Sequence, residues 1–218
     1  MRSFCIVFFL ALNFFICINK VKANTDNELT GWGFIDINIP LERIRHGLSL
    51  RESFSHRFNN EFSELDISLF RSELASDWNK NLQTSLGYDH FRIYHRDANY
   101  ENRLWQQILL RKKLSKNELY SRFRIEERFT EASPLVLRLR NRSGYIYYLS
   151  KSLSLDLSNE IFLNLVNSEG IDQNRVMLLV RKDINKHLSI IGGYQIQHFF
   201  LDKNLINHGL ITRLQISL

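Results

Sequence analysis

The sequence predicts an all-β protein, an antiparallel transmembrane β-barrel of ten or twelve strands, and three observations lead to this fold class. Over residues 152–165, apolar and polar side chains alternate strictly, which is typical of a strand with one apolar and one polar face. No apolar run after Ala23 is long enough to cross a bilayer as a helix, so only strands could cross it. The alternation also continues up to the last residue, Leu218.

The first residues have the pattern of a secretory signal peptide. Arg2 precedes an apolar run of about 15 residues, shorter than a membrane-spanning helix, and Val21 and Ala23 fit a cleavage site. We therefore expect residues 1–23 to be removed and residues 24–218 to form a single outer-membrane barrel domain. An uncleaved membrane anchor is the alternative.

Removal of this segment changes the composition of the chain. The only two cysteines, Cys5 and Cys17, would leave with it, so the mature chain would have no disulfide. The net charge of +6 would be halved, because the segment carries three basic residues and no acidic one. Such a mild charge on an exported protein argues against a nucleic-acid partner.

Two further segments repeat the alternation. Phenylalanine and isoleucine alternate with arginine and glutamate over residues 120–129, and leucine alternates with arginine from Leu135 onwards. Less regular runs cover residues 28–39, 43–54, 62–72, 82–94, 101–111, 174–182, 188–199 and 206–218. A soluble barrel or sandwich, whose polar face would meet bulk water, is the alternative to a membrane barrel.

The number of strands follows from these runs only indirectly. They total eleven, whereas single-chain bacterial barrels have an even number of strands, which returns both ends to the periplasm. We therefore expect ten or twelve strands. The run at residues 28–39 could be a strand of the wall or a segment outside it.

The last strand carries a candidate assembly signal, formed by Leu214, Ile216 and Leu218. This pattern resembles the C-terminal strand of outer-membrane barrels, whose alternating apolar residues are recognised by the barrel-assembly machinery. In this chain Leu218 replaces the usual terminal phenylalanine. The expected location is the bacterial outer membrane. The expected partners are outer-membrane lipid and, during biogenesis, the barrel-assembly machinery, whereas the oligomeric state stays open.

Several segments resemble the DUF2490 family in order and spacing. They are residues 101–107 (ENRLWQQ), 122–129 (RFRIEERF), 138–140 (RLR), 172–175 (DQNR) and 193–197 (GYQIQ). The resemblance extends from about Trp32 to Leu218. It implies an exported outer-membrane barrel of uncharacterised role, and it supplies no catalytic residues.

If the leucines at positions 137, 139, 153, 155 and 157 face lipid, the opposite faces fill the lumen with charge. The expected charge network consists of Glu101, Arg103, Arg122, Arg124, Glu126, Arg128, Arg138, Arg140, Glu160 and Arg175. With Arg111, Arg142 and Asp156, nine arginines face four acids, so at least five arginines are expected to lack an acidic partner. Guanidinium groups bind carboxylates bidentately, so the network is either a salt-bridged structural core or the lining of a narrow pore that prefers anions.

An enzyme is the alternative function, because some outer-membrane barrels hydrolyse or acylate lipids with a serine and a histidine. The candidates are His90, His198 and His208 with Ser85 or Ser189. No Gly-x-Ser-x-Gly or H-x-x-x-H motif occurs, so we expect no catalytic residue, no metal site and no cofactor.

Aromatic residues make up 12% of the chain, and many fall near predicted strand ends, as expected for the girdles of a membrane barrel. Trp32, Trp78 and Tyr147 are examples. Residues 88–100 form the longest predicted loop, which is the expected external contact surface.

Overall fold

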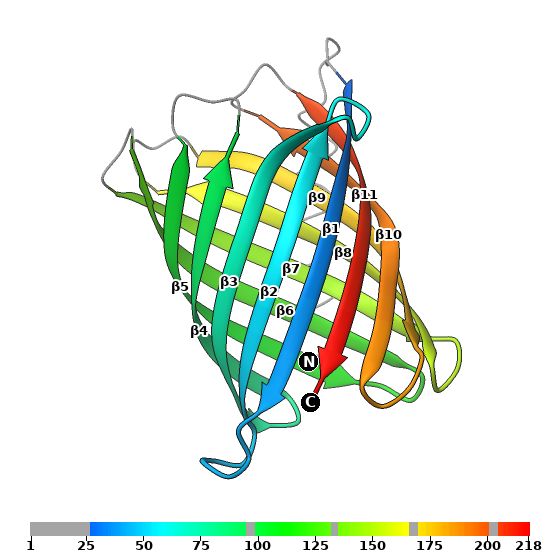
Figure 1. Ribbon diagram of the computed structural model, residues 1–218. Helices are drawn as coiled ribbons and strands as arrows, with labels where there is room; N and C mark the ends of the chain where they lie inside the picture. Colours follow the sequence, from blue (N-terminus) through cyan, green and yellow to red (C-terminus); the bar gives the residue numbers. More distant parts are fainter. Residues whose placement is uncertain (1–26, 95–98, 132–134, 166–169, 201–204) are drawn as a thin grey trace.

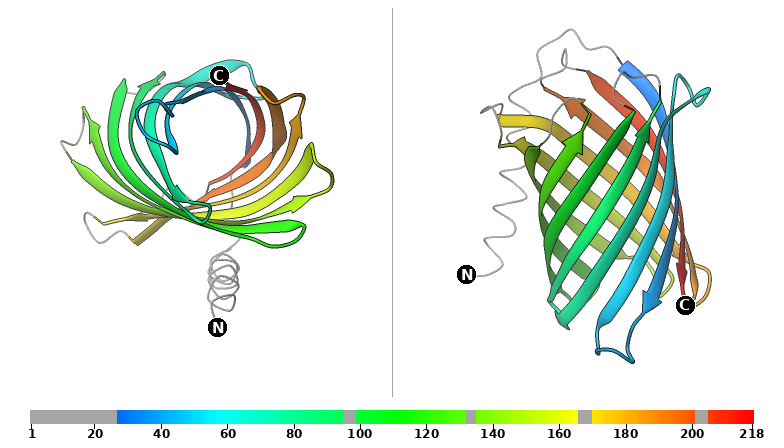
Figure 2. Two further views of the ribbon diagram at one scale, coloured as in Figure 1. Left: turned by 90° about the horizontal axis from the view of Figure 1, so that it is seen from below. Right: turned by 60° about the vertical axis from the view of Figure 1, so that its left-hand side comes forward.

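The computed structural model describes residues 27–94, 99–131, 135–165, 170–200 and 205–218. All regular elements in these ranges are strands, and the strands close into one barrel (Figures 1 and 2). They are β1 (Asn27–Pro40), β2 (Leu48–Asn59), β3 (Glu64–Asn79), β4 (Leu82–Ile93), β5 (Tyr100–Lys113), β6 (Asn117–Thr130), β7 (Val136–Tyr148), β8 (Leu153–Asn164), β9 (Gly170–Asp183), β10 (Leu188–Phe199) and β11 (Ile206–Ser217). The described ranges contain no helix that is long and apolar enough to cross a membrane. The predicted signal peptide, residues 1–23, lies outside them.

The prediction of ten or twelve strands is wrong, because the barrel has eleven. Each of the eleven alternating runs corresponds to one strand, and the run at residues 28–39 lies in the wall as β1. The error came from the rule that both chain ends return to one side of the membrane. That rule describes most bacterial barrels, but odd strand numbers do occur.

An odd strand number decides how the barrel closes. All sequential neighbours pair antiparallel, whereas β1 and β11 pair in parallel from Asn27 opposite Ile206 to Asn38 opposite Ser217 (Figure 1). The Thr30 hydroxyl donates a hydrogen bond to the His208 carbonyl, and the Thr212 hydroxyl donates one to the Trp32 carbonyl. This seam closes the sheet without leaving an exposed edge.

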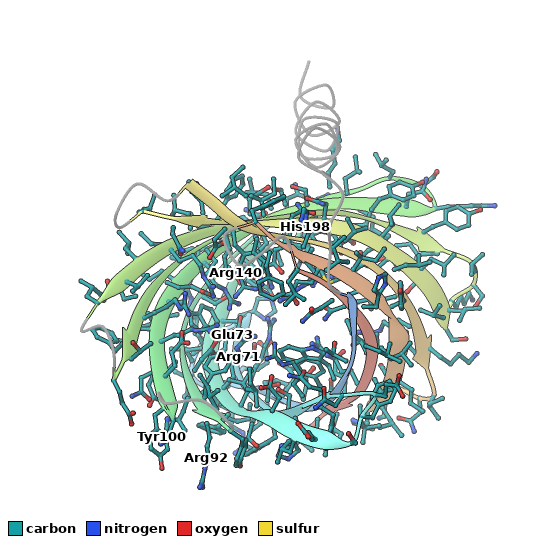
Figure 3. All side chains as sticks on the ribbon, turned by 90° about the horizontal axis from the view of Figure 1, so that it is seen from above. Arg71, Glu73, Arg92, Tyr100, Arg140 and His198 are labelled. Atoms are coloured by element: carbon teal, nitrogen blue, oxygen red, sulfur yellow. The ribbon has the colours of Figure 1, made fainter. Side chains whose placement is uncertain are left out.

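Side chains alternate between the two faces of the wall, as the strand period of two requires. Leu157 on β8 is 50% exposed on the outer face, and its neighbour across the β8–β9 pair, Leu178, is 51% exposed. Glu160 lies an odd number of positions after Leu157 and therefore on the opposite face of the strand. It is 1% exposed and faces inward. In Figure 3, Arg71 and Arg140 point into the interior. The leucines and the charged residues thus lie on the faces that the alternation predicts.

The two ends of the barrel differ in their connections. Residues 80–81, 114–116, 149–152 and 184–187 form short turns at the end where β11 finishes, together with the longer connection at 41–47 (Figure 1). β1 begins at the opposite end. The predicted 88–100 loop is mostly strand, since β4 extends to Ile93 and β5 begins at Tyr100. Residues 95–98 between them lie outside the described ranges.

One residue of the predicted aromatic girdle has a different place. Trp32 points into the barrel, where its ring stacks on Phe34 with the ring centroids 5.7 Å apart. The Arg57 guanidinium lies 5.4 Å from the centroid of the Trp32 ring. This indole therefore belongs to the packing of the interior.

Candidate functional site

The inner face of β6 and β7 is organised around the carboxylate of Glu126, which is completely buried. Arg138, directly opposite it on β7, donates two hydrogen bonds of 3.0 and 2.7 Å to Oε2. Arg140 donates one of 2.5 Å to Oε1, and Nη1 of Arg124 lies 3.6 Å from the same oxygen. One carboxylate thus holds three guanidinium groups from two adjacent strands.

Glu160 has the same role on β8, two strands further along the barrel wall. Its Oε1 accepts hydrogen bonds of 3.1 and 2.7 Å from Arg140 and one of 2.5 Å from Arg122. Nη1 of Arg175, on β9, lies 3.7 Å from its Oε2. Since Arg140 binds both Glu126 and Glu160, the two clusters form one continuous network.

Glu101 on β5 forms a third cluster near the end of the barrel where β1 begins. Its Oε1 accepts hydrogen bonds of 2.5 Å from Arg103 and from Arg128, which also reaches Oε2 at 3.0 Å. The Arg103 guanidinium stacks 3.8 Å from the centroid of the Phe91 ring.

Two buried aromatic rings act as platforms for these guanidinium groups. The Trp105 indole donates a hydrogen bond of 2.8 Å to Asp89, and Arg124 stacks 3.7 Å from its ring centroid. Arg71 binds both oxygens of Asp89, at 2.7 and 2.6 Å. The second platform is Phe162, which has the guanidinium carbons of Arg138, Arg140 and Arg175 at 5.1, 4.5 and 5.1 Å. Stacking of this kind fixes the plane of a guanidinium group.

All ten residues of the charge network expected from the sequence lie on the inner face and take part in these ion pairs. The predicted deficit of acidic partners is wrong, however. Each of these nine arginines has a carboxylate within 4.0 Å, because Glu101, Glu126 and Glu160 are shared and because Asp77, an acid outside the predicted set, pairs with Arg111. A count of charges does not reveal how many guanidinium groups one carboxylate can reach.

Sequence reasoning also missed part of the interior. Asp89, Arg71 and Glu73 face inward, and Arg71 and Glu73 are visible beside Arg140 in Figure 3. Trp105 and Phe162 were not identified as interior residues either. The sequence signal for two of them is the placement of Arg71 and Glu73 at alternating positions in β3, one of the less regular runs.

We define the arginine network as Arg71, Arg103, Arg122, Arg124, Arg128, Arg138, Arg140 and Arg175 with Asp89, Glu101, Glu126 and Glu160. It joins eight guanidinium groups to four carboxylates. The wall formed by β10, β11, β1 and β2 buries mainly neutral polar groups: Thr30, Ser55, Ser189, Gln195, Gln197 and Asn207. The same wall also carries Arg57, paired with Asp66, and Arg213, paired with Asp36, so the arginine network on β3 to β9 holds most but not all of the inward-facing positive charge.

The candidate serine and histidine residues do not come together. His90 and His208 are bonded to Asn102 and Tyr194 on the outer face, whereas Ser85 and Ser189 are bonded to Gln107 and Arg181 on the inner face. His198, on β10, also lies on the outer side of the wall by its register. Among the described residues, no group of three or more His, Cys, Asp and Glu side chains could hold a metal ion.

The residues of the predicted assembly signal end the last strand. Leu214 and Ile216 lie on β11 opposite Ile190 and Leu188, and Leu218 follows the strand with 67% of its surface exposed. Their role in assembly stays a prediction.

The fold and the interior define a class of protein, a closed eleven-stranded β-barrel with an arginine-rich polar core. The chain belongs to the DUF2490 family, described as a protein of unknown function, whose model matches residues 29–207. No curated protein matches the chain. Among solved structures, it is similar to the anion-selective porin from Comamonas acidovorans, with a TM-score of 0.39 and 11% identity over 75% of this chain and 51% of the porin. The chain thus spans about half the length of that porin.

Proposed function

We propose that the chain is an outer-membrane β-barrel of a Gram-negative bacterium and forms a narrow pore that prefers anions. The observation that carries the proposal is the excess of guanidinium groups over carboxylates in the arginine network, on the inner face of a closed barrel. A wall with surplus positive charge and little bulk water attracts anions and repels cations.

The outer face supports placement in a membrane. Large apolar side chains are exposed on it around the barrel, among them Ile35, Leu74, Leu86, Leu104, Leu157, Leu178, Ile190 and Leu210. Soluble proteins rarely expose so extensive an apolar surface, whereas a membrane barrel needs an apolar band. Residues 1–23 would be the cleaved export signal, and the short turns would face the periplasm.

Arginine placed in the middle of this band should destabilise the membrane-inserted barrel. Leu157→Arg should cost about 2–4 kcal/mol, the value for arginine near the bilayer midplane. Ile184 is similarly exposed, at 52%, but lies in the turn between β9 and β10. Ile184→Arg should therefore cost at most about 1 kcal/mol. Denaturant titration of folding into lipid bilayers measures both values, and equal losses would contradict placement in a membrane.

The direct test of the pore is the reversal potential of refolded protein in a planar bilayer under a KCl gradient. We expect a small conductance whose reversal potential has the sign of a chloride-selective path. Arg71→Gln removes a charge whose side chain is 23% exposed inside the barrel, so it should move the reversal potential towards zero. Lys80→Gln, in the exposed turn between β3 and β4, should leave it unchanged. Cation selectivity would overturn the proposal.

A second candidate function is a closed structural barrel. It is favoured by the sharing of Glu126 and Glu160 among guanidinium groups from β6, β7 and β9, which links the four neighbouring strands β6 to β9 along the inner wall. A folded barrel without measurable conductance would support this candidate and overturn the pore.

A further inference from the structure

Three buried N–H groups of the arginine network have no acceptor. Nε of Arg122, Nη1 of Arg124 and Nε of Arg175 are inaccessible to solvent and have no hydrogen-bond partner in the part of the chain that the structure describes. Leaving a buried donor unpaired costs about 1–3 kcal/mol, so native proteins rarely do so without a reason.

The donors belong to one region of the inner wall. Arg122 and Arg175 both reach Glu160, and Arg124 reaches Glu126, which is joined to Glu160 through Arg140. The unpaired Nη1 of Arg124 is 3.6 Å from Glu126, whereas Arg122 and Arg175 approach Glu160 through an Nη group, at 2.5 and 3.7 Å, and leave Nε unused. The distances of 3.6 and 3.7 Å exceed those of hydrogen bonds, although they still allow ionic attraction.

The guanidinium groups are held in position before any ligand arrives. Arg124 is fixed between the Trp105 ring and Gln107, which accepts hydrogen bonds of 3.0 and 2.7 Å from it. Arg175 is stacked against Phe162, and Arg71 is bonded to both oxygens of Asp89. A ligand would therefore meet preorganised donors, which lowers the entropic cost of binding.

The missing acceptor has to come from outside this part of the chain. The three nearby carboxylates already form ion pairs with six guanidinium groups. The carboxylates are those of Asp89, Glu126 and Glu160, and the guanidinium groups are those of Arg71, Arg122, Arg124, Arg138, Arg140 and Arg175. A ligand with several acceptor oxygens and more than one negative charge could pair with several guanidinium groups and offset the excess of positive charge. Guanidinium groups bind phosphate oxygens in paired hydrogen bonds, whereas chloride offers no such geometry.

The region can be reached from the interior. The side chains of Arg71, Arg122 and Arg175 keep 23%, 18% and 18% of their surface exposed. Figure 3 shows Arg71 and Arg140 pointing into the interior of the barrel, whereas the side chain of Arg124 is only 2% exposed.

We propose that Arg71, Arg122, Arg124 and Arg175 form a binding site for a polyvalent oxyanion of the phosphate type. The inference deepens the proposed function, on which its role in transport rests, because it names phosphate-like oxyanions as the class of solute that the pore selects. Binding itself requires no conductance, so it can be tested separately.

The test is phosphate binding by the purified full-length barrel, refolded in detergent and followed by calorimetry and by its unfolding midpoint. Inorganic phosphate should bind and raise the midpoint relative to sodium chloride at equal ionic strength, since a ligand of the folded state stabilises it. Arg175→Gln is the preferred variant, because it removes the unpaired Nε of a residue whose ion pair, made through Nη1, is long. It should weaken phosphate binding by about tenfold, the equivalent of one lost charged hydrogen bond.

The matched control is Arg111→Gln, the same substitution in an arginine that pairs with Asp77 near the end of the barrel with the short turns. It should bind phosphate like the parent protein. If Arg175→Gln does not fold, Arg122→Gln takes its place. The proposal is overturned if phosphate stabilises the barrel no more than chloride does, or if the network variant and the control bind phosphate equally. Phosphate binding without conductance would support the binding site and overturn the proposed pore. Anion conductance without phosphate binding would support the pore and overturn the binding site.

Discussion

Glu126→Ala should lower the free energy of unfolding by about 3–5 kcal/mol, the usual cost of removing one partner from a buried ion pair. Glu126 is completely buried and holds Arg124, Arg138 and Arg140. Without it, Arg138 loses the carboxylate to which it donates two hydrogen bonds, and three positive groups remain close together in a region of low dielectric constant. Denaturant titration in detergent or lipid measures the loss.

Two substitutions serve as controls for this prediction. Glu127→Ala removes the same type of side chain from the next residue, which is exposed on the outer face, so stability should change by less than about 0.5 kcal/mol. Arg142→Ala should cost less than Glu126→Ala, because it removes a positive charge from an interior that has an excess of them. A Glu126→Ala variant as stable as the parent would show that the shared carboxylate does not hold the network together.

Trp105→Ala should also cost about 3–5 kcal/mol, the range for truncating a large buried aromatic residue. The Trp105 side chain is 1% exposed. Its indole N–H donates a hydrogen bond to Asp89, and the Arg124 guanidinium group stacks on its ring. Truncation would leave a cavity, an unpaired Asp89 oxygen and a guanidinium group without its platform.

A double-mutant cycle with Gly87 can isolate this packing. A Cβ atom added at Gly87 would collide with the Trp105 indole, which is rigid, so Gly87→Ala alone should cost about 1–3 kcal/mol. In the Trp105→Ala background the collision is absent, and Gly87→Ala should then cost nothing. The two substitutions are therefore strongly coupled. Additive losses would mean that Trp105 does not pack over Gly87.

The orientation of the strands could be predicted from the sequence because it depends on a local property. Over much of β6, β7 and β8, apolar residues alternate with polar or charged ones, and the side-chain period of a strand then determines which residues share a face. The charge network follows from the same alternation. No knowledge of neighbouring strands is needed for either conclusion.

The number of strands and the pairing of charges depend on contacts between distant residues, so the sequence did not settle them. Arg140 reaches Glu126 on one neighbouring strand and Glu160 on the other, which depends on register and side-chain length together. The inward position of Trp32 depends likewise on the pairing of β1 with β2 and β11. The prediction that Trp32 belongs to the aromatic girdle rested on its distance from a strand end, which does not indicate whether the side chain faces inward or outward.

The parallel seam between β1 and β11 has a consequence for the kinetics of folding. Every other strand pair joins neighbours in sequence and can grow from its own turn, whereas Asn27 pairs with Ile206, close to the other end of the chain. Bringing such distant segments together carries a large loop-closure entropy, and parallel pairing is slightly weaker per residue than antiparallel pairing. High contact order of this kind slows folding. The seam should therefore be the last pair to form and the first to separate, which makes it the point where an open sheet of ten hairpin-linked pairs becomes a barrel.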